Sequence, residues 1–333
     1  MRSVLLSVMV LLTGHGLQLT LLPLKAQSLD WPSELIGLTG SAYYLGFVVG
    51  CLYIPRIIRR VGHIRSFGAG VAVATIAIVL AGLQPDFVLW LMLRFLTGCS
   101  LAALYTVVES WLNEQADNQT RVSILAVYTT ISLGAMAAGQ MFVEIDRFSF
   151  EELFGIAAVL LIAATLPISL TTNPQPTAPA EVSIDWRLAY RASHVGVVCA
   201  GFSGVVVGLL WSMGAIYASD MGGSIEAGSR FVMFAILGGF VFQFPAGRLS
   251  DYFDRRVIIL ALTAIGASGA GLAIVTSPEY EPVLYLSAFL CGAGAMPMYS
   301  ICVAHANDNA NGSFLQIASA MLITNALGSI AGP

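Results

Sequence analysis

Long apolar runs alternate with short polar segments along the whole chain. A run of about twenty apolar residues is long enough to cross the hydrocarbon core of a bilayer as an α-helix. The pattern predicts an all-α, polytopic membrane protein. Its eleven predicted spans are residues 3–24, 35–57, 66–84, 87–110, 120–143, 152–171, 193–217, 228–247, 257–276, 282–304 and 314–333.

The composition agrees with lipid as the solvent of this chain. Hydrophobic residues make up 57% of the 333 positions and charged residues only 10%, whereas a soluble domain is about 25% charged. No soluble core of this length could bury so much apolar surface. The net charge of −4 gives no support for a nucleic-acid partner. We therefore expect the lipid bilayer as a partner and no nucleic acid.

The arginines set the expected orientation. Cytoplasmic loops of membrane proteins carry an excess of Lys and Arg. One set of alternating loops holds eleven basic residues and the other set holds three, Lys25, Arg147 and Arg230, while Arg94 lies within a span. This asymmetry predicts a cytoplasmic N-terminus. The Arg-rich loops carry Arg2, Arg56, Arg59, Arg60, Arg65, Arg121, Arg187, Arg191, Arg248, Arg255 and Arg256.

A polar, Pro-rich segment and an internal repeat divide the chain. Residues 172–191 interrupt the apolar pattern and predict a cytoplasmic linker. A shift of 194 residues places Phe95 and Gly98 on Phe289 and Gly292, and Gly134 on Gly328. Two six-helix bundles in the same orientation follow, as parallel repeats about an axis along the membrane normal. The expected domains are 1–171, the linker 172–191 and 192–333.

The repeat also predicts where the second bundle should end. The first bundle ends near residue 171, and its counterpart would lie at 171 + 194 = 365, beyond the last residue of the sequence. We therefore expect an incomplete C-terminal bundle whose last helix is missing, which makes the chain a C-terminally truncated fragment.

Two motifs suggest a family. Residues 247–256, GRLSDYFDRR, closely resemble the G-x-L-x-D-x-x-x-R-R loop signature of the major facilitator superfamily, and residues 94–98, RFLTG, resemble that family's R-x-x-x-G element. The first-half copy of the loop, residues 50–65, keeps glycines and arginines but has no Asp. Together with residues 109–113, ESWLN, it is similar to a branch of bacterial permeases of largely unassigned substrate.

The resemblance implies a fold and a function. The family's fold is two parallel-related six-helix bundles, and its activity is secondary transport by alternating access, with substrate bound near the midplane between the halves. For this chain it implies a monomer in the bacterial inner (plasma) membrane that carries a small organic solute, with protons as the expected coupling ion. A drug-like efflux antiporter and a non-transporting receptor or scaffold remain the alternatives.

Polar side chains inside the spans are the candidates for substrate binding or coupling. Arg94 lies eight residues after Asp86, about 12 Å into the membrane, and an intramembrane charge is a functional candidate. His15 can exchange protons near neutral pH. Each of these side chains could instead make a structural hydrogen bond or pack. The full set is His15, Gln18, Tyr43, Tyr44, Arg94, Tyr105, Gln140, Trp211, Gln243, Tyr299 and Asn325.

A second group of residues is expected to hold one conformation from the cytoplasmic side. Glu109 follows Asp86 by 23 residues, about 35 Å of helix, so it lies at the cytoplasmic end. A carboxylate at a helix C-terminus is unfavourable without a nearby cation. Gly247 is expected to allow close helix approach. The predicted latch residues are Arg56, Arg59, Arg60, Glu109, Gly247, Asp251, Asp254, Arg255 and Arg256.

Motifs of other functional classes are missing from the sequence. It contains no G-x-x-x-x-G-K-[ST] phosphate-binding loop and no paired catalytic constellation. The five cysteines, which have no C-x-x-C spacing, are expected to be buried free thiols. We expect no enzyme activity, no cofactor and no metal site, and an ion gradient or the solute's own gradient as the energy source.

Overall fold

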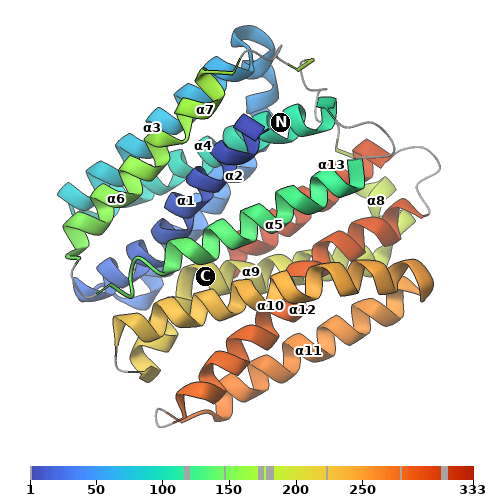
Figure 1. Ribbon diagram of the computed structural model, residues 1–333. Helices are drawn as coiled ribbons and strands as arrows, with labels where there is room; N and C mark the ends of the chain where they lie inside the picture. Colours follow the sequence, from blue (N-terminus) through green and yellow to red (C-terminus); the bar gives the residue numbers. More distant parts are fainter. Residues whose placement is uncertain are drawn as a thin grey trace. The chain divides into compact units, whose positions relative to one another are not determined.

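The computed structural model describes residues 2–115, 121–145, 148–171, 176–177, 184–222, 224–277, 280–308 and 314–333. All regular structure in these residues is α-helical, with the order shown in Figure 1. The helices are α1 (Arg2–Ser28), α2 (Ser33–Val61), α3 (His63–Leu83), α4 (Phe87–Gln115), α5 (Arg121–Gln140), α6 (Phe150–Ala163), α7 (Thr165–Ser169), α8 (Trp186–Ala192), α9 (His194–Gly222), α10 (Ile225–Tyr252), α11 (Arg255–Val275), α12 (Glu281–Asn307) and α13 (Phe314–Ala331).

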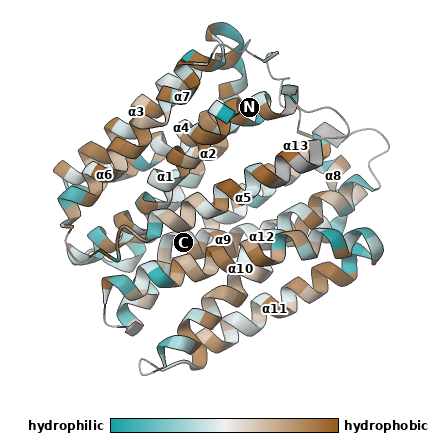
Figure 2. Ribbon diagram, viewed as in Figure 1, coloured by the Kyte–Doolittle hydropathy of each residue, from teal (hydrophilic) through white to brown (hydrophobic). Residues whose placement is uncertain are grey.

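The helices have the length and hydropathy of membrane spans. Among the described residues, nine helices are long and apolar enough to cross a bilayer, and each has a mean hydropathy of at least 1.5. Figure 2 shows brown and white along the helices and teal gathered near many of their ends. The prediction of an all-α polytopic membrane protein is confirmed.

Three predicted segments differ from the structure in more than the exact position of their ends. The span 152–171 is broken at Ala164 into α6 and α7, because the ring of Pro167 clashes with the carbonyl four residues earlier, at the end of α6. The span 120–143 ends at Gln140, after which the chain turns. The linker 172–191 contains most of α8, whose first turn is capped by the Asp185 carboxylate accepting from the Leu188 amide at 2.9 Å.

The chain divides into two compact units. The first comprises residues 1–29 and 42–181, and the second comprises residues 30–41 and 182–333. In the first unit α1 packs against α5 and α6, and α3 packs against α4 and α6. Lys25 at the end of α1 pairs with Glu151 at 3.4 Å, and its ammonium lies 4.9 Å from the Phe150 ring centroid. These contacts fix the end of α1 on the start of α6.

The second unit is built around α12. This helix packs against α9, α10 and α11, while α13 packs along α9. The first turns of α2 belong to this unit rather than to the first: the Ser41 hydroxyl donates to the Ile330 carbonyl at 2.7 Å. The helix α2 is therefore shared by the two units, which its uninterrupted apolar pattern did not indicate.

Glycines allow α2 and α4 to cross with their backbones in contact. A Cβ at Gly46 would overlap the carbonyl oxygen of Phe95, and a Cβ at Gly98 would overlap that of Tyr43. Gly46 thus faces the carbonyl of the residue three positions before Gly98, and Gly98 faces the carbonyl of the residue three positions before Gly46. Small residues at a helix crossing permit such an approach within a membrane.

The second unit repeats this crossing between α10 and α12. A Cβ at Gly238 would overlap the Phe289 carbonyl, and a Cβ at Gly292 would overlap the Ala235 carbonyl. The spacing between corresponding positions is 194 residues in α4 and α12, as the sequence repeat predicts, and 192 residues in α2 and α10. The two units therefore share a helix crossing of the same construction.

A second reciprocal crossing joins α1 to α5. A Cβ at Gly16 would overlap the Met136 carbonyl, and a Cβ at Gly139 would overlap the Thr13 carbonyl. The second unit repeats this pattern where α9 meets α13. The corresponding glycines of the second unit are Gly204, facing the Asn325 carbonyl, and Gly328, facing the Gly201 carbonyl.

This second crossing corrects one alignment made from the sequence. Gly328 corresponds to Gly139, at a spacing of 189 residues, and not to Gly134. A Cβ at Gly134 would meet nothing within 4 Å. The shift of 194 residues holds for α4 and α12 but is wrong for α5 and α13.

Candidate functional site

Arg94 lies inside the first unit, about one turn before the crossing of α4 with α2. It is 8% exposed, and its guanidinium carbon lies 4.5 Å from the centroid of the Tyr43 ring. The contact follows from the fold, because Gly98 brings the backbone of α4 against Tyr43 and so places the preceding turn of α4 beside the tyrosine ring. A cation over an aromatic face is attracted by the ring quadrupole.

Tyr43 connects Arg94 to the middle of α1. The Tyr43 hydroxyl lies 3.4 Å from Nε2 of His15, and the two rings stack with centroids 5.8 Å apart. Tyr44 packs edge-on against Tyr43 at 5.1 Å. His15, Tyr43 and Arg94 are buried, as is Gln18 one turn after His15, while Tyr44 is half-buried. These five residues, His15, Gln18, Tyr43, Tyr44 and Arg94, are called the Arg94 cluster.

The charge of Arg94 is not neutralised within the cluster. In the described part of the chain Arg94 makes no ion pair, and its Nη1 atom is buried without a hydrogen-bond partner. A cation buried without a counter-charge is costly, because desolvation is not repaid by Coulombic attraction. The sequence indicated Arg94 by its depth, but it could not show that the counter-charge is missing.

The polar face of α4 continues from Arg94 toward the end of the helix. The Tyr105 ring packs edge-on against Phe47 at 6.2 Å, a partner that the sequence analysis did not name, although it lies one turn after Tyr43 and Tyr44. Glu109 is exposed and close enough to Tyr105, Cys51 and Tyr128 to act on them electrostatically.

The first-unit arginines of the predicted latch lie near the end of α2. The Arg56 guanidinium lies 5.7 Å from the Tyr53 ring centroid, and its Nη1 donates to the Leu52 carbonyl at 3.4 Å. Arg59 and Arg60 are exposed near the end of α2. The pairing of Glu109 with these arginines stays a prediction.

Gln140 holds two helices together. Its side-chain nitrogen donates to the Gly16 carbonyl at 2.7 Å, and its side-chain oxygen accepts a hydrogen bond from the Thr20 hydroxyl. Gln140 is completely buried. Both ends of the amide are thus used between α1 and α5, beside the Gly16 crossing, which favours a structural role over solute binding.

Replacing Gln140 by alanine is therefore expected to destabilise the first unit by about 1–2 kcal/mol, because the Thr20 hydroxyl and the Gly16 carbonyl lose a buried partner. The measurement is the apparent melting temperature of the purified protein in detergent. Gln243→Ala is the matched control, since the side-chain nitrogen of Gln243 donates at 3.3 Å to the exposed Ser300 hydroxyl. Equal melting temperatures for the two variants would contradict the expectation.

The other candidates lie in the second unit. The side-chain nitrogen of Asn325 donates to the Ala200 carbonyl at 2.9 Å, and Ser329 donates to the Gly204 carbonyl at 3.0 Å. Asn325 therefore bridges α13 to α9 much as Gln140 bridges α5 to α1. Tyr299 packs beside a buried core cluster, and Trp211 is half-buried in α9. The solute-binding role of these residues stays a prediction.

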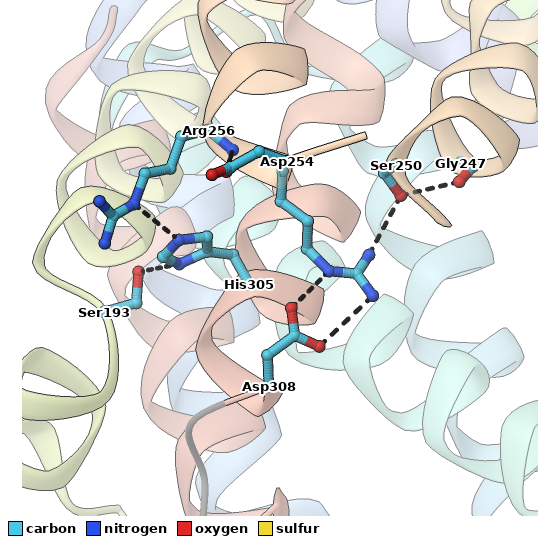
Figure 3. Close-up of polar contacts among 8 residues, drawn as sticks. Ser193, Gly247, Ser250, Asp254, Arg256, His305 and Asp308 are labelled. Carbon is cyan, nitrogen blue, oxygen red and sulfur yellow. Dashed lines mark hydrogen bonds and ion pairs between the residues drawn. The ribbon is translucent and has the colours of Figure 1, made fainter. Parts of the chain in front are cut away.

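An ion pair joins α11 to the end of α12, as Figure 3 shows. Nε of Arg255 donates to Asp308 at 2.6 Å, and Nη2 donates to the same carboxylate at 3.4 Å. Nη1 of Arg255 reaches the Ser250 hydroxyl at 3.1 Å, and that hydroxyl donates to the Gly247 carbonyl at 2.7 Å. The motif loop is thus fixed to α12 by two charge-assisted contacts.

His305 extends this network to the end of α8. Nε of Arg256 donates to Nε2 of His305 at 3.3 Å, and Nδ1 of His305 lies 2.7 Å from the Ser193 hydroxyl. Because Nε2 accepts from Arg256, the proton of a neutral imidazole is assigned to Nδ1, which then donates to Ser193. The sequence analysis missed His305, Ser193 and Asp308. Only the match of Asp308 with Glu114 in the repeat could have indicated one of them.

Three members of the predicted latch do not act as expected. A Cβ at Gly247 would meet nothing within 4 Å, so the idea that this glycine permits close helix packing is wrong. Asp251 is exposed and has no ion pair within the described residues. Asp254 instead caps α11, with its carboxylate accepting from the Arg256 amide at 2.8 Å. The charge network therefore runs from Arg255 to α12 and not along the loop.

Comparison with known proteins decides the family. The family model described as Major Facilitator Superfamily matches residues 4–333. The chain belongs to the major facilitator superfamily. The transport and membrane character expected of this superfamily therefore apply to it, and the resemblance noted in the two sequence motifs is confirmed.

Relatives within the superfamily share the chain nearly end to end. The "Uncharacterized MFS-type transporter YcaD" of Salmonella newport (strain SL254) is 27% identical over 319 residues, covering 94% of this chain and 82% of the relative. The YcaD protein of Salmonella typhi gives the same values. Neither name states a substrate.

Solved structures of superfamily members show the same fold. The nucleoside transporter NupG has a TM-score of 0.77 at 13% identity, covering 99% of this chain and 88% of the transporter. A D-xylose-proton symporter has a TM-score of 0.68 at 13% identity, covering 98% and 89%. At this identity the likeness concerns the fold alone.

Proposed function

We propose that the protein is a secondary active transporter, not an enzyme, which moves a small organic solute across the bacterial inner membrane by alternating access and couples this movement to protons. The observation that carries the proposal is the Arg94 cluster. It places a buried, uncompensated cation, an imidazole and two tyrosines within membrane-spanning helices. Polar groups at this depth cost free energy, and proteins keep them mainly where they serve a function.

Transporters with the same fold support a small organic solute and a proton as the coupling ion. Its members with the same fold include a nucleoside transporter and a D-xylose-proton symporter, so small polar organic solutes and a proton gradient both suit this architecture. His15 is the proposed proton carrier, because an imidazole can change charge and its Nε2 lies 3.4 Å from the Tyr43 hydroxyl. We further propose that the protein is a monomer with a cytoplasmic N-terminus, as its arginine distribution favours.

The network around Arg255 is the proposed conformational latch of the second unit. The bidentate contact of Arg255 with Asp308 and the contact of Arg256 with His305 hold α11 on α12. Asp308 is about half exposed, so the pair contributes little to stability. Its proposed role is to favour one conformation, which requires only a small difference in energy between two states.

Proteoliposomes that contain the purified full-length protein test the proposal. We expect an inward proton gradient to increase uptake of at least one solute in a panel of sugars, nucleosides, amino acids and organic acids, and a protonophore to remove that increase. The measurement is initial uptake of labelled solute, with a trapped pH-sensitive dye reporting proton entry. Protein-free liposomes are the control. Failure of every solute to enter above this control would contradict transport, and uptake independent of the gradient would contradict proton coupling.

A further inference from the structure

The missing counter-charge of Arg94 points to the chemistry of the solute. Arg94 is only 8% exposed. Within the described residues it has no carboxylate partner, and one of its two terminal nitrogens has no hydrogen-bond partner at all. The Tyr43 ring offers only its negative face, which compensates a cation far less than a carboxylate does. The residues around Arg94 thus leave its charge uncompensated.

We propose that the Arg94 cluster binds the carboxylate of an organic monoanion, which serves as the missing counter-charge; this inference rests on the proposed transport function. A guanidinium forms two parallel hydrogen bonds with a carboxylate, and its Nη1 would gain the partner it lacks. The unpartnered atom belongs to a residue that is more than nine-tenths buried. This atom therefore lies inside the protein and not on a solvated surface.

The charge count favours a carboxylate over a phosphate. Among the described residues of the first unit, Arg94 is the only lysine or arginine deep within a span, since Lys25, Arg56 and the other described arginines lie at or near helix ends. While His15 is neutral, the single charge of Arg94 neutralises a monoanion. A phosphate dianion would leave an uncompensated negative charge at a place where desolvation makes it costly.

The surrounding rings indicate the rest of the solute. Tyr44, Phe47 and Tyr105 are half-buried and continue from Tyr43 along the same faces of α2 and α4. Aromatic side chains offer apolar faces with few polar groups. The solute bound at Arg94 therefore has a carboxylate at one end and an apolar or aromatic body.

Matched pairs of carboxylates and amides test this inference by binding. The probes are benzoate, phenylacetate, 3-phenylpropionate and hexanoate, each compared with its amide, and phenyl phosphate. The measurement is the apparent melting temperature of the purified chain in detergent as the probe is titrated. We expect at least one carboxylate to bind the wild type 10-fold or more tightly than its amide. Phenyl phosphate is expected to bind more weakly than that carboxylate.

Variants of Arg94 identify the group responsible. Arg94→Gln is expected to lose the preference for carboxylate over amide, and Arg94→Lys, which keeps the charge but not the bidentate geometry, to retain part of it. Arg191→Gln, which removes an exposed guanidinium in α8, should bind as the wild type does. The inference is overturned if no carboxylate exceeds its amide, if phenyl phosphate binds most tightly, or if Arg94→Gln keeps the preference.

Uptake assays separate this inference from the proposed function. If proteoliposomes transport only neutral solutes, and Arg94→Gln transports them as well as the wild type does, transport stands and the carboxylate inference falls. If the wild type prefers carboxylates in the binding assay but transports none of the panel, the inference stands and the proposed function falls.

Discussion

Gly98→Ala is expected to lower the melting temperature of the protein sharply, while Gly134→Ala leaves it unchanged or raises it. A Cβ at Gly98 would overlap the backbone carbonyl of Tyr43, which cannot rotate away, so α2 and α4 must separate. Such overpacking costs about 1–3 kcal/mol and sometimes more. The same separation would pull the Tyr43 ring away from Arg94, so transport should fail in any protein that remains folded.

Gly134 and Gly247 supply matched controls, because a Cβ at either position meets nothing within 4 Å. Alanine favours a helix over glycine by about 1 kcal/mol, so these variants should be at least as stable as the wild type. Gly292→Ala, at the equivalent crossing of the second unit, should behave like Gly98→Ala. The measurement is thermal unfolding in detergent together with the monodisperse fraction in size-exclusion chromatography. A Gly98→Ala protein as stable as Gly134→Ala would show that the two helices are not in backbone contact.

The fold could be predicted from the sequence because lipid imposes a simple rule. Every backbone polar group within the membrane must be bonded inside its own helix, so twenty apolar residues define a span almost by themselves. Two predicted segments were wrong where local chemistry interrupts this rule. Pro167 breaks one span into α6 and α7, and a capped helix begins at Trp186 within the predicted linker.

Only part of the candidate site could be predicted from the sequence. Depth is a property of one helix, so the positions of Arg94 and Glu109 along α4 could be predicted from the sequence. Contacts between helices depend on crossings that the sequence does not specify. Gln140 was therefore named as a lining residue, although its amide bonds Gly16 and Thr20 on α1, and Gly134 was aligned with Gly328 where Gly139 makes the contact.

The same limit applies to charge networks. The motif in residues 247–256 has acids and arginines as neighbours in sequence, which favours ion pairs within the loop. Arg255 instead pairs with Asp308, 53 positions away, and Arg256 contacts His305 on the same helix α12. A loop motif identifies the family more reliably than it identifies the partners of each charge.

Arg94→Met is expected to make the protein more stable and at the same time unable to transport its solute. Methionine fills much of the volume of the arginine side chain without a charge, so the cost of a buried, uncompensated guanidinium disappears. Replacing buried charges by apolar residues of similar volume is often stabilising by about 1–4 kcal/mol, which corresponds to a rise of a few degrees in melting temperature. Uptake should fall about 100-fold or more, because a buried charge that binds an anion contributes at least this much.

Two comparisons make this result specific to Arg94. Arg191→Met removes an exposed arginine and should change neither melting temperature nor uptake by much. Arg94→Lys keeps a cation at the site and should remain less stable than Arg94→Met. If Arg94 were instead a structural residue bonded to its neighbours, Arg94→Met would lower the melting temperature, as Gln140→Ala is expected to do. A less stable Arg94→Met protein with normal uptake would therefore contradict both the binding role of Arg94 and the absence of a counter-charge around it. A more stable and inactive protein would mean that the first unit carries an unfavourable charge because the solute requires it.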